Sequence, residues 1–322
     1  MSAQLGLGLA ALGRPGYVTL GHADDLGGRY DPSSMEAHAH AVLDAAYESG
    51  IRYFDVARSY GRAEEFVASW VRSRHIAPRE IMIASKWGYT YTAGWSTSAA
   101  QHEIKDHSVA TFERQLAESV ERLGDYLSLY QIHSVTADCA TLDDDALIDA
   151  LVRLREGNIM VGLTVSGPGQ GVAIRRALEV RHHGVCIFDF IQATWNLLER
   201  GAESALEDAH AAGRRVVLKE VLANGRLTDA NHDDDPVLSP RVALVRELAA
   251  DRDQPIEALA LAAALAQPWV DVVLSGAATV EQIRFSVAAA HLSYDAQLDL
   301  RLRDVVLPPE QYWKARSGFA WN

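Results

Sequence analysis

The sequence has few cysteines and a deficit of positive charge. Its two cysteines, Cys139 and Cys186, form no CxxC pair, so neither a disulfide framework nor a cysteine-based metal site is suggested. The 30 Lys and Arg residues are outnumbered by 43 Asp and Glu residues, which gives a formal net charge of −13. Such a chain repels phosphate backbones, and no basic run with interleaved aromatics offsets the repulsion. We therefore expect no nucleic-acid partner.

Long apolar runs are also missing. No window reaches the roughly 18 consecutive apolar residues that a membrane span needs. The N-terminal stretch MSAQLGLGLAALGRPG has no positively charged start, and its apolar part is short and broken by glycines, unlike a secretory signal. Together with the low cysteine content, these absences favour a cytoplasmic protein without a membrane partner.

A GxGxxG fingerprint is absent from the first apolar run, whose glycines stand at 6, 8 and 13 and are not followed by a helical pattern. This spacing disfavours a doubly wound open sheet, the competing architecture. The sequence does contain an alternation of short, strand-like apolar runs with longer segments of helical period. The eight strand-like runs are residues 5–10, 52–57, 81–86, 127–133, 161–167, 188–195, 215–220 and 270–276.

The segments between these runs are typical of helices. They lie at 33–50, 63–74, 109–124, 145–158, 172–184, 202–214, 242–250 with 256–267, and 280–292. Strands apolar enough to be buried on both faces predict a parallel sheet, and eight right-handed βα units favour its closure. We expect a single (β/α)8 TIM barrel over residues 1–322, with loops near 87–108, 221–236 and 306–322 around the barrel mouth.

Polar residues close most of these runs, where a barrel carries its active site. They are Asp55, Lys86, His133, Ser166, Gln192 and the pair Lys219 and Glu220, joined by Tyr60 in the loop after the second run. Taken singly, each has an ordinary structural explanation as a cap, a surface lysine or a buried histidine. Together, Asp, Tyr, Lys and His at one barrel mouth indicate proton transfer to a carbonyl. A carbonyl that accepts hydride becomes an alkoxide, and a nearby acid must supply the proton as that charge develops.

Each of these four residues has an expected part in that chemistry. Tyr60 is a suitable acid, and a nearby Lys86 would lower its pKa from the usual value of about 10. Asp55 would hold Lys86 charged and in place. His133 would orient the carbonyl or share in proton delivery.

Seven motifs give the sequence a resemblance to the aldo-keto reductase superfamily. They are FDVARSYG, SKWG, LYQIH, TVSG, IQATWNLLER, LANGRLT and SGAATVEQI, which occur in the order and at the spacing of that family and cover nearly the whole chain. The resemblance implies an NAD(P)-dependent oxidoreductase of aldehydes or ketones. It implies Asp55, Tyr60, Lys86 and His133 as the catalytic tetrad, with Tyr60 as the proton donor.

The resemblance also implies a cofactor site. Ser166 and Gln192 would hold the nicotinamide carboxamide, and the segment from Ser275 to Gln282 would hold phosphate at a helix N-terminus. The full expected set is Ser166, Gly167, Gln192, Trp195, Lys219, Leu222, Asn224, Ser275, Gly276, Ala277, Gln282, Arg284 and Phe285.

Three departures from the family pattern affect that site. Gly167 replaces an asparagine, which removes one carboxamide contact. Lys219 stands where many members stack an aromatic on the nicotinamide, so either Trp195 substitutes or the stack is absent.

The third departure concerns cofactor choice. Phe285 and Ser286 replace a Glu-Asn pair, and Ala278 replaces an arginine. Arg284 is the nearby arginine that could bind a 2′-phosphate, or it is a solvated helix residue. NADP(H) is favoured as the family default, and NAD(H) is possible.

Aromatic residues in the mouth loops predict a pocket for an apolar or ring-bearing carbonyl or alcohol. The candidates are Trp87, Tyr89, Trp95 and Trp313, with Tyr91, Tyr312 and Trp321 as further members, and at least half of them are expected to pack the loops onto the barrel. His38 and His40 are two residues apart on a helix and face differently, so no metal site is expected.

Two other functions stay open on the same fold, because a fold does not dictate an activity. One is a regulatory protein that binds the cofactor and turns over slowly. The other is a non-redox barrel enzyme, which the changes at Gly167 and Lys219 would suit. The oligomeric state is not indicated.

Overall fold

The computed structural model describes residues 3–232 and 235–321. Eight parallel strands close into a barrel in the order β1-β12-β11-β10-β7-β6-β3-β2. They are β1 (Gln4–Gly8), β2 (Tyr53–Asp55), β3 (Met82–Trp87), β6 (Leu127–Val135), β7 (Met160–Val165), β10 (Phe190–Thr194), β11 (Arg215–Lys219) and β12 (Val272–Ser275). Each falls on one of the eight predicted runs, so the expected (β/α)8 barrel is confirmed.

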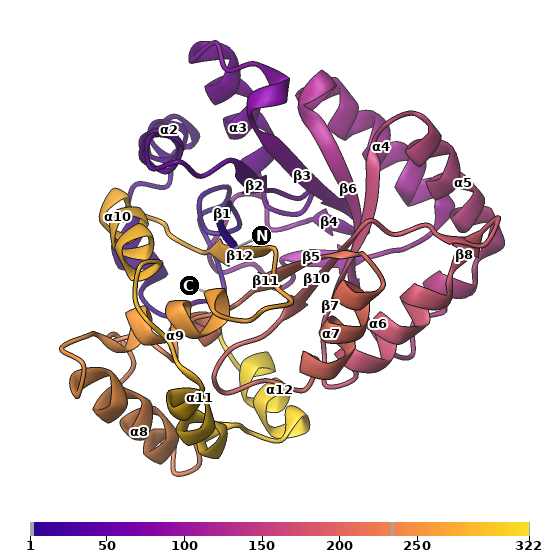
Figure 1. Cartoon of the computed structure of the whole chain (residues 1–322). Helices are drawn as coiled ribbons and strands as arrows, with labels where there is room; N and C mark the ends of the chain where they lie inside the picture. Colours follow the sequence, from indigo (N-terminus) through magenta and orange to yellow (C-terminus); the bar gives the residue numbers. More distant parts are fainter. Residues whose placement is uncertain (1–2, 233–234, 322) are drawn as a thin grey trace.

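The helices surround the strands, as Figure 1 shows. Those on predicted segments are α2 (Pro32–Glu48), α3 (Ala63–Ser73), α4 (Val109–Leu123), α5 (Asp145–Glu156), α6 (Gln170–Glu179), α7 (Glu203–Ala211), α8 (Ser239–Ala250), α9 (Ile256–Leu265) and α10 (Val280–Ala289). Side-chain caps fix several of their starts: Asp31 accepts from Ser34 N ahead of α2, and Thr279 accepts from Gln282 N ahead of α10.

Smaller elements decorate the barrel. They are the helices α1 (His22–Leu26), α11 (Ala296–Leu302) and α12 (Pro309–Ser317), the hairpin β4 (Tyr89–Tyr91) with β5 (Glu103–Lys105), and the hairpin β8 (Arg181–His182) with β9 (Val185–Cys186). The β8–β9 hairpin corrects the helix expected over 172–184. Val180 is extended, with φ −70° and ψ 108°, and Gly184 has φ 79°, so the chain leaves the helix at Glu179 and turns back on itself.

The barrel interior changes character along its strands. Near the amino ends, inward side chains form an apolar layer of Tyr53, Ala84, Leu129, Phe190 and Val217. Two residues later on the same strands stands a polar layer of Asp55, Lys86, Gln131, Gln192 and Lys219. Because strand side chains alternate in direction with a period of two, both layers face the barrel axis.

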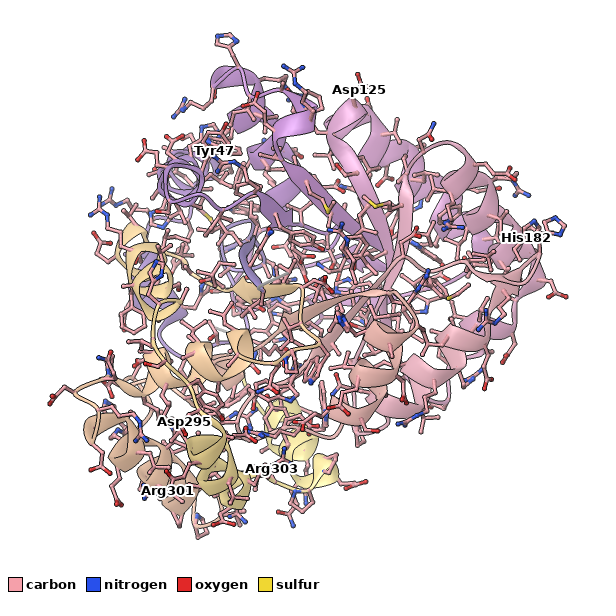
Figure 2. All side chains as sticks on the ribbon, in the orientation of Figure 1. Tyr47, Asp125, His182, Asp295, Arg301 and Arg303 are labelled. Atoms are coloured by element: carbon pink, nitrogen blue, oxygen red, sulfur yellow. The ribbon has the colours of Figure 1, made fainter. Side chains whose placement is uncertain are left out.

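The residues that alternate with these inward positions along the strands point outward and build the main core against the helices. Phe54 packs on Trp70 of α3 with ring centroids 5.2 Å apart, and Trp87 packs on Phe112 of α4 at 5.0 Å. In Figure 2 the labelled Asp125 and His182 lie at the outer edge near α4 to α6, and Arg301 and Asp295 lie around α11. Of the helices in the described residues, none combines the length and apolar character needed to cross a bilayer.

Candidate active site

Asp55 ends β2 and is the hub of the polar layer. Its carboxylate pairs with the Lys86 ammonium and accepts from Gln192 Nε2 at 2.9 Å and Gln131 Nε2 at 3.4 Å. Lys86 Nζ also donates to the Val56 carbonyl at 3.1 Å. Asp55 is 2% exposed and Lys86 1%, so the pair is buried, and the amide donors share the stabilisation of its carboxylate.

Tyr60 reaches the same lysine from the loop after β2. Lys86 Nζ donates to Tyr60 Oη at 3.3 Å, and Tyr60 N donates to the Ala57 carbonyl at 3.0 Å. The backbone of this loop packs closely against the segment after β1, and Arg62 N donates to the Gly13 carbonyl at 2.7 Å. A Cβ on Gly13 would collide with the Tyr60 carbonyl oxygen, and one on Gly61, at φ 57°, would collide with the Gly13 carbonyl oxygen.

His133 of β6 completes the group. Its ring lies edge-on to Tyr60 with centroids 5.6 Å apart, and the Tyr89 ring lies 4.9 Å away on the hairpin side. Burial, assisted by the positive charges of Lys86 and Lys219, holds the pKa of His133 well below its usual value. The imidazole is therefore neutral at pH 7, and a neutral ring can donate one hydrogen bond to a carbonyl.

The pKa of Tyr60 differs from the expectation. Burial and the negative charge of Asp55 raise the pKa of Tyr60 well above its usual value, and Arg14 is the group that lowers it. Burial lowers the pKa of Lys86, against the opposing influence of Asp55. The expectation that Lys86 lowers the Tyr60 pKa is therefore not met, because burial and the nearby carboxylates hold Tyr60 in its protonated form.

Arg14 is a site residue that the sequence pattern did not reveal. Its guanidinium carbon lies 5.2 Å from the Tyr60 ring centroid, 5.3 Å from that of Tyr17 and 4.7 Å from that of Trp321. Arg14 Nη1 donates to the Ser59 carbonyl at 2.9 Å and pairs with Glu103 of the β4–β5 hairpin. This one side chain therefore joins the loops after β1 and β2, the hairpin and the C-terminal segment.

A pair of charged residues, Lys219 and Glu220, stands at the end of β11 and contacts the last residue of β10. Lys219 Nζ donates to Thr194 Oγ1 at 3.1 Å, and Thr194 donates to Glu220 Oε2 at 3.2 Å. Arg316 of α12 donates to Glu220, which together with Lys219 brings the pKa of this carboxyl to about 2 despite its burial. Burial lowers the pKa of Lys219 to about 8.

A cavity of about 790 Å³ connects these groups with the N-terminus of α10. Its catalytic end is lined by Tyr60, His133, Lys219 and the aromatic residues Tyr17, Tyr89, Trp313 and Trp321. Its distal end is lined by residues 20–25, 224–230, 255–261 and 274–286 in part. The volume is in the range of small-molecule and cofactor sites, roughly 300–1,000 Å³.

The segment after β1 crosses this cavity and is fastened on its far side. Asn224 Nδ2 donates to the Val18 carbonyl at 3.0 Å, and Leu20 N donates to the Asn224 carbonyl at 3.1 Å. Further along, Gln282 Nε2 donates to Asp25 Oδ1 at 2.9 Å. These contacts join the segment after β1 to the segment after β11 and to α10. All three line the same cavity.

A profile described as the Aldo/keto reductase family matches residues 5–300. The chain belongs to the aldo/keto reductase family. Pyridoxal 4-dehydrogenase of Microbacterium luteolum is 29% identical over 320 residues, covering 86% of this chain and 91% of that protein. L-glyceraldehyde 3-phosphate reductase of Escherichia coli O157:H7 is 24% identical over 312 residues, covering 86% of each.

A solved structure shares the fold of this aldo/keto reductase. The holo form of an aldo-keto reductase from Bacillus halodurans matches with a TM-score of 0.73 at 24% identity, over 95% of this chain and 93% of that one. Family membership makes the chain an oxidoreductase, and the family generally uses nicotinamide cofactors on small-molecule carbonyl compounds.

Most residues expected to bind cofactor or substrate lie at the cavity of this aldo/keto reductase. Its lining includes Ser166, Gly167, Gln192, Lys219, Leu222, Asn224, Ser275, Gly276, Ala277, Gln282, Phe285, Tyr89 and Trp313. Asp55, Tyr60 and His133 line it too, and Lys86 lies directly behind Asp55 and Tyr60. The structure thus brings the four expected catalytic residues together.

Six residues expected at the cofactor or substrate site do not line the cavity, Tyr91 and Tyr312 among them; Tyr312 is buried, and its hydroxyl accepts from Asn196 Nδ2 at 2.9 Å. Trp87 and Trp195 each follow an inward residue and so point outward: Trp87 packs against α4, and Trp195 packs on Trp269 and donates to Glu203 at 3.1 Å. Trp195 therefore does not supply the stacking surface missing at Lys219.

Trp95 and Arg284 also lie elsewhere. Trp95 donates to the Tyr30 carbonyl and packs on Phe66, and Arg284 is exposed on α10. Alternation along the strands could have placed Trp87 and Trp195 correctly. Arg14 and Tyr17 come from the loop after β1, Glu103 from the short strand β5 and Arg316 from α12, and no periodic signal in the sequence marks them. Within the described residues, no group of three or more His, Cys, Asp or Glu side chains is arranged to hold a metal ion.

Proposed function

We propose that this oxidoreductase reduces aldehydes or ketones with hydride from NAD(P)H and a proton from Tyr60. The observation that carries the proposal is the geometry at Tyr60. Its hydroxyl oxygen accepts from Lys86 at 3.3 Å, its ring meets the neutral His133, and both residues line one cavity. This arrangement leaves the phenolic proton available to an oxygen atom bound in the cavity.

The cavity suits a nicotinamide dinucleotide in length and in chemistry. It extends from the tetrad to the N-terminus of α10, where first-turn N–H groups without helical partners favour phosphate. Gly276 lines this stretch, and an added Cβ there would meet nothing within 4 Å, so a ligand can approach the backbone closely. We assign Ser166, Gly167 and Gln192 to the nicotinamide end, Ser275 to Ala277 to the phosphates, and Gln282, which holds Asp25, to the adenosine end.

When bound, the nicotinamide supplies the hydride. Tyr60 donates its proton to the carbonyl oxygen, and the Lys86 ammonium stabilises the phenolate that remains. Asp55 keeps the ammonium beside Tyr60 Oη, while Gln192 and Gln131 hold Asp55. His133, neutral because of its burial, donates to the same carbonyl oxygen and orients it.

The catalytic end favours a substrate with a ring. Tyr17, Tyr89, Trp313 and Trp321 line it, and aromatic walls bind planar rings by stacking and edge contacts. Two relatives are named for pyridoxal and for L-glyceraldehyde 3-phosphate, so both aldehydes belong in a substrate panel beside simple aromatic aldehydes.

The test is carbonyl-dependent oxidation of NADH and NADPH, followed by loss of nicotinamide absorbance, in the wild type and in Tyr60→Phe. We expect Tyr60→Phe to reduce kcat by roughly 10²–10⁴-fold, because one proton donor is removed. Full activity in Tyr60→Phe would overturn the assigned role.

A matched control is available in Tyr47→Phe. Tyr47 lies on α2 at the outer face of the molecule (Figure 2), where its hydroxyl donates to Glu80 at 3.0 Å. Removing this hydroxyl should leave kcat unchanged. Cofactor binding without turnover on the whole panel would instead favour a regulatory protein.

A further inference from the structure

We infer that the cavity selects NAD(H) over NADP(H), and that the carboxylates of Asp25 and Glu257 set this selection. The inference rests on the proposed function, because it takes the nicotinamide to lie beside Tyr60. It reverses the choice favoured by family resemblance, and it follows from how charge is distributed over the two ends of the cavity.

All basic side chains that line the cavity belong to its catalytic end. Among the described lining residues these are Arg14, Lys219 and Arg316. Arg14 pairs with Glu103 beside Tyr60, and Arg316 pairs with Glu220 at the end of β11. A nicotinamide placed next to Tyr60 occupies this end, so the adenosine must lie at the other.

The distal end carries carboxylates and, among its described lining residues, no lysine or arginine. Asp25, Asp229 and Glu257 line it. Asp25 is fixed by Gln282, whose Nε2 donates to it at 2.9 Å, and Glu257 Oε1 accepts from Asp229 N at 2.7 Å. Asp229 lies 3.6 Å from Arg246, which offsets its charge, so Asp25 and Glu257 are the two carboxylates that dominate.

The α10 segment offers no compensating cation. Small residues, from Gly276 to Ala278, line the cavity ahead of the helix, and Arg284 is exposed and absent from the lining. The Gln282 side chain is occupied on both sides, because its Oε1 accepts from Ala278 N at 2.8 Å while its Nε2 holds Asp25. Apart from the α10 N–H groups that we assign to the bridging phosphates, no cationic side chain in this stretch is therefore arranged to neutralise an added 2′-phosphate.

The two cofactors differ only at the ribose 2′ position. A 2′-hydroxyl can donate to a carboxylate, which is how dinucleotide sites specific for NAD commonly read it. A 2′-phosphate monoester carries a charge of about −1.5 to −2 near pH 7 and cannot donate in the same way. Asp25 and Glu257 thus attract the first group and repel the second.

The experiment measures binding directly, without turnover. NADH, NADPH, NAD⁺ and NADP⁺ are titrated into the purified protein by calorimetry, with quenching of tryptophan fluorescence as a second readout, since Trp313 and Trp321 line the cavity. We expect the wild type to bind NADH at least about tenfold more tightly than NADPH, a difference of about 1.4 kcal/mol. Added salt should narrow the gap, because it screens the repulsion.

Three variants locate the effect. Asp25→Asn keeps an oxygen for Gln282 and removes the charge, and Glu257→Gln does the same for Asp229 N. The double variant should lower the ratio of the NADPH Kd to the NADH Kd about tenfold, mainly by tightening NADPH. Asp24→Asn is the matched control, because Asp24 is exposed and does not line the cavity. Its ratio should equal that of the wild type.

The possible results separate three claims: the selection of NAD(H), the roles of Asp25 and Glu257, and the proposed function. Equal or tighter binding of NADPH by the wild type overturns the inference and leaves the proposed reductase standing. Selection of NADH that survives in the double variant overturns the roles of Asp25 and Glu257. Failure of all four nucleotides to bind, in a protein with normal thermal unfolding, removes the proposed function itself.

Discussion

The apolar layer and the polar layer inside the barrel are two residues apart on the same five strands, yet they differ in polarity, in hydrogen bonding and in access to the cavity. The apolar layer around Tyr53 and Phe190 belongs to a small hydrophobic cluster that fills the barrel near the amino ends of the strands. The polar layer above it holds an ion pair and two amides, and it opens into the cavity. Each strand therefore stabilises the barrel with its apolar inward residue and contributes to the active site with the polar inward residue that follows two positions later.

The two layers also differ in the interactions that stabilise their side chains. In the apolar layer, Phe190 needs only contact, and its ring centroid lies 6.3 Å from that of Tyr53, whose buried hydroxyl has no hydrogen-bond partner among the described residues. In the polar layer, Asp55 depends on Lys86, Gln192 and Gln131 at once. Loss of one partner there leaves a buried charge or amide without compensation, which costs more than the loss of a contact between apolar groups.

The largest effect is expected from Lys86→Met, which breaks the ion pair of the polar layer. It removes the donor to Tyr60 and leaves the Asp55 carboxylate buried without a cation, so we expect kcat/KM to fall at least about 10³-fold. The free energy of unfolding should also fall by about 3–5 kcal/mol, as for other broken buried pairs. Steady-state rates and urea denaturation measure the two effects separately.

The double variant Asp55→Asn/Lys86→Met serves as the control. It removes both charges, and the asparagine oxygen can still accept from Gln192. Most of the lost stability should return, while activity stays low. If activity returned together with stability, the role of Lys86 would be structural only.

A smaller effect on activity is expected from Phe190→Ala in the apolar layer. Phe190 is 1% exposed, so its truncation opens a cavity and should cost about 3–5 kcal/mol of unfolding free energy. The kcat of the folded enzyme at low temperature should be nearly unchanged. Phe190→Leu should cost less than about 1.5 kcal/mol. A loss of kcat as large as that of Lys86→Met would contradict the separation of the layers.

Expressed as a free energy, the smallest expected effect comes from Arg14→Met, outside both layers: a tenfold change in rate corresponds to about 1.4 kcal/mol. Arg14 lowers the pKa of Tyr60, so its removal raises that pKa further. Alcohol oxidation needs the phenolate and increases as Tyr60 loses its proton, so the rising limb of its pH profile should move to higher pH. At pH 9 we expect oxidation to fall by about tenfold and carbonyl reduction to fall less.

Arg14→Lys keeps a cation and should restore part of the profile. Arg14 also joins several loops, so thermal unfolding of both variants must be compared. Equal shifts of the pH profile in Arg14→Lys and Arg14→Met would mean that the charge of Arg14 is not what acts on Tyr60.

The strands were predictable because each is a short apolar run closed by a polar residue. The same signal placed Asp55, Lys86, His133 and Gln192 at the barrel mouth, since inward residues at strand ends face the cavity. The hairpin formed by β8 and β9 was missed, because the residues after Glu179 continue a helical pattern and only the backbone at Val180 and Gly184 ends it.

The remaining parts of the site depend on contacts distant in sequence. Arg14 and Glu103 meet across 89 residues, and Asp25 and Gln282 across 257. Gln282 stands in the SGAATVEQI motif, but no motif or periodic pattern joins the two members of either pair. The charge at the distal end of the cavity is likewise a property of three separate segments. The resemblance alone favoured NADP(H), whereas our proposal of NAD(H) selection depends on the assembled wall.

The contact between Gly13 and Gly61 has a consequence for how this enzyme tolerates variation. Neither residue has a side chain to touch a ligand, yet the carbonyl of each neighbouring loop occupies the space where a methyl group would stand. An alanine at either position would push the loop of Tyr60 away from Lys86. Among random variants we therefore expect replacements at these two glycines to be tolerated far less often than replacements among the residues that line the cavity, although neither glycine lines it.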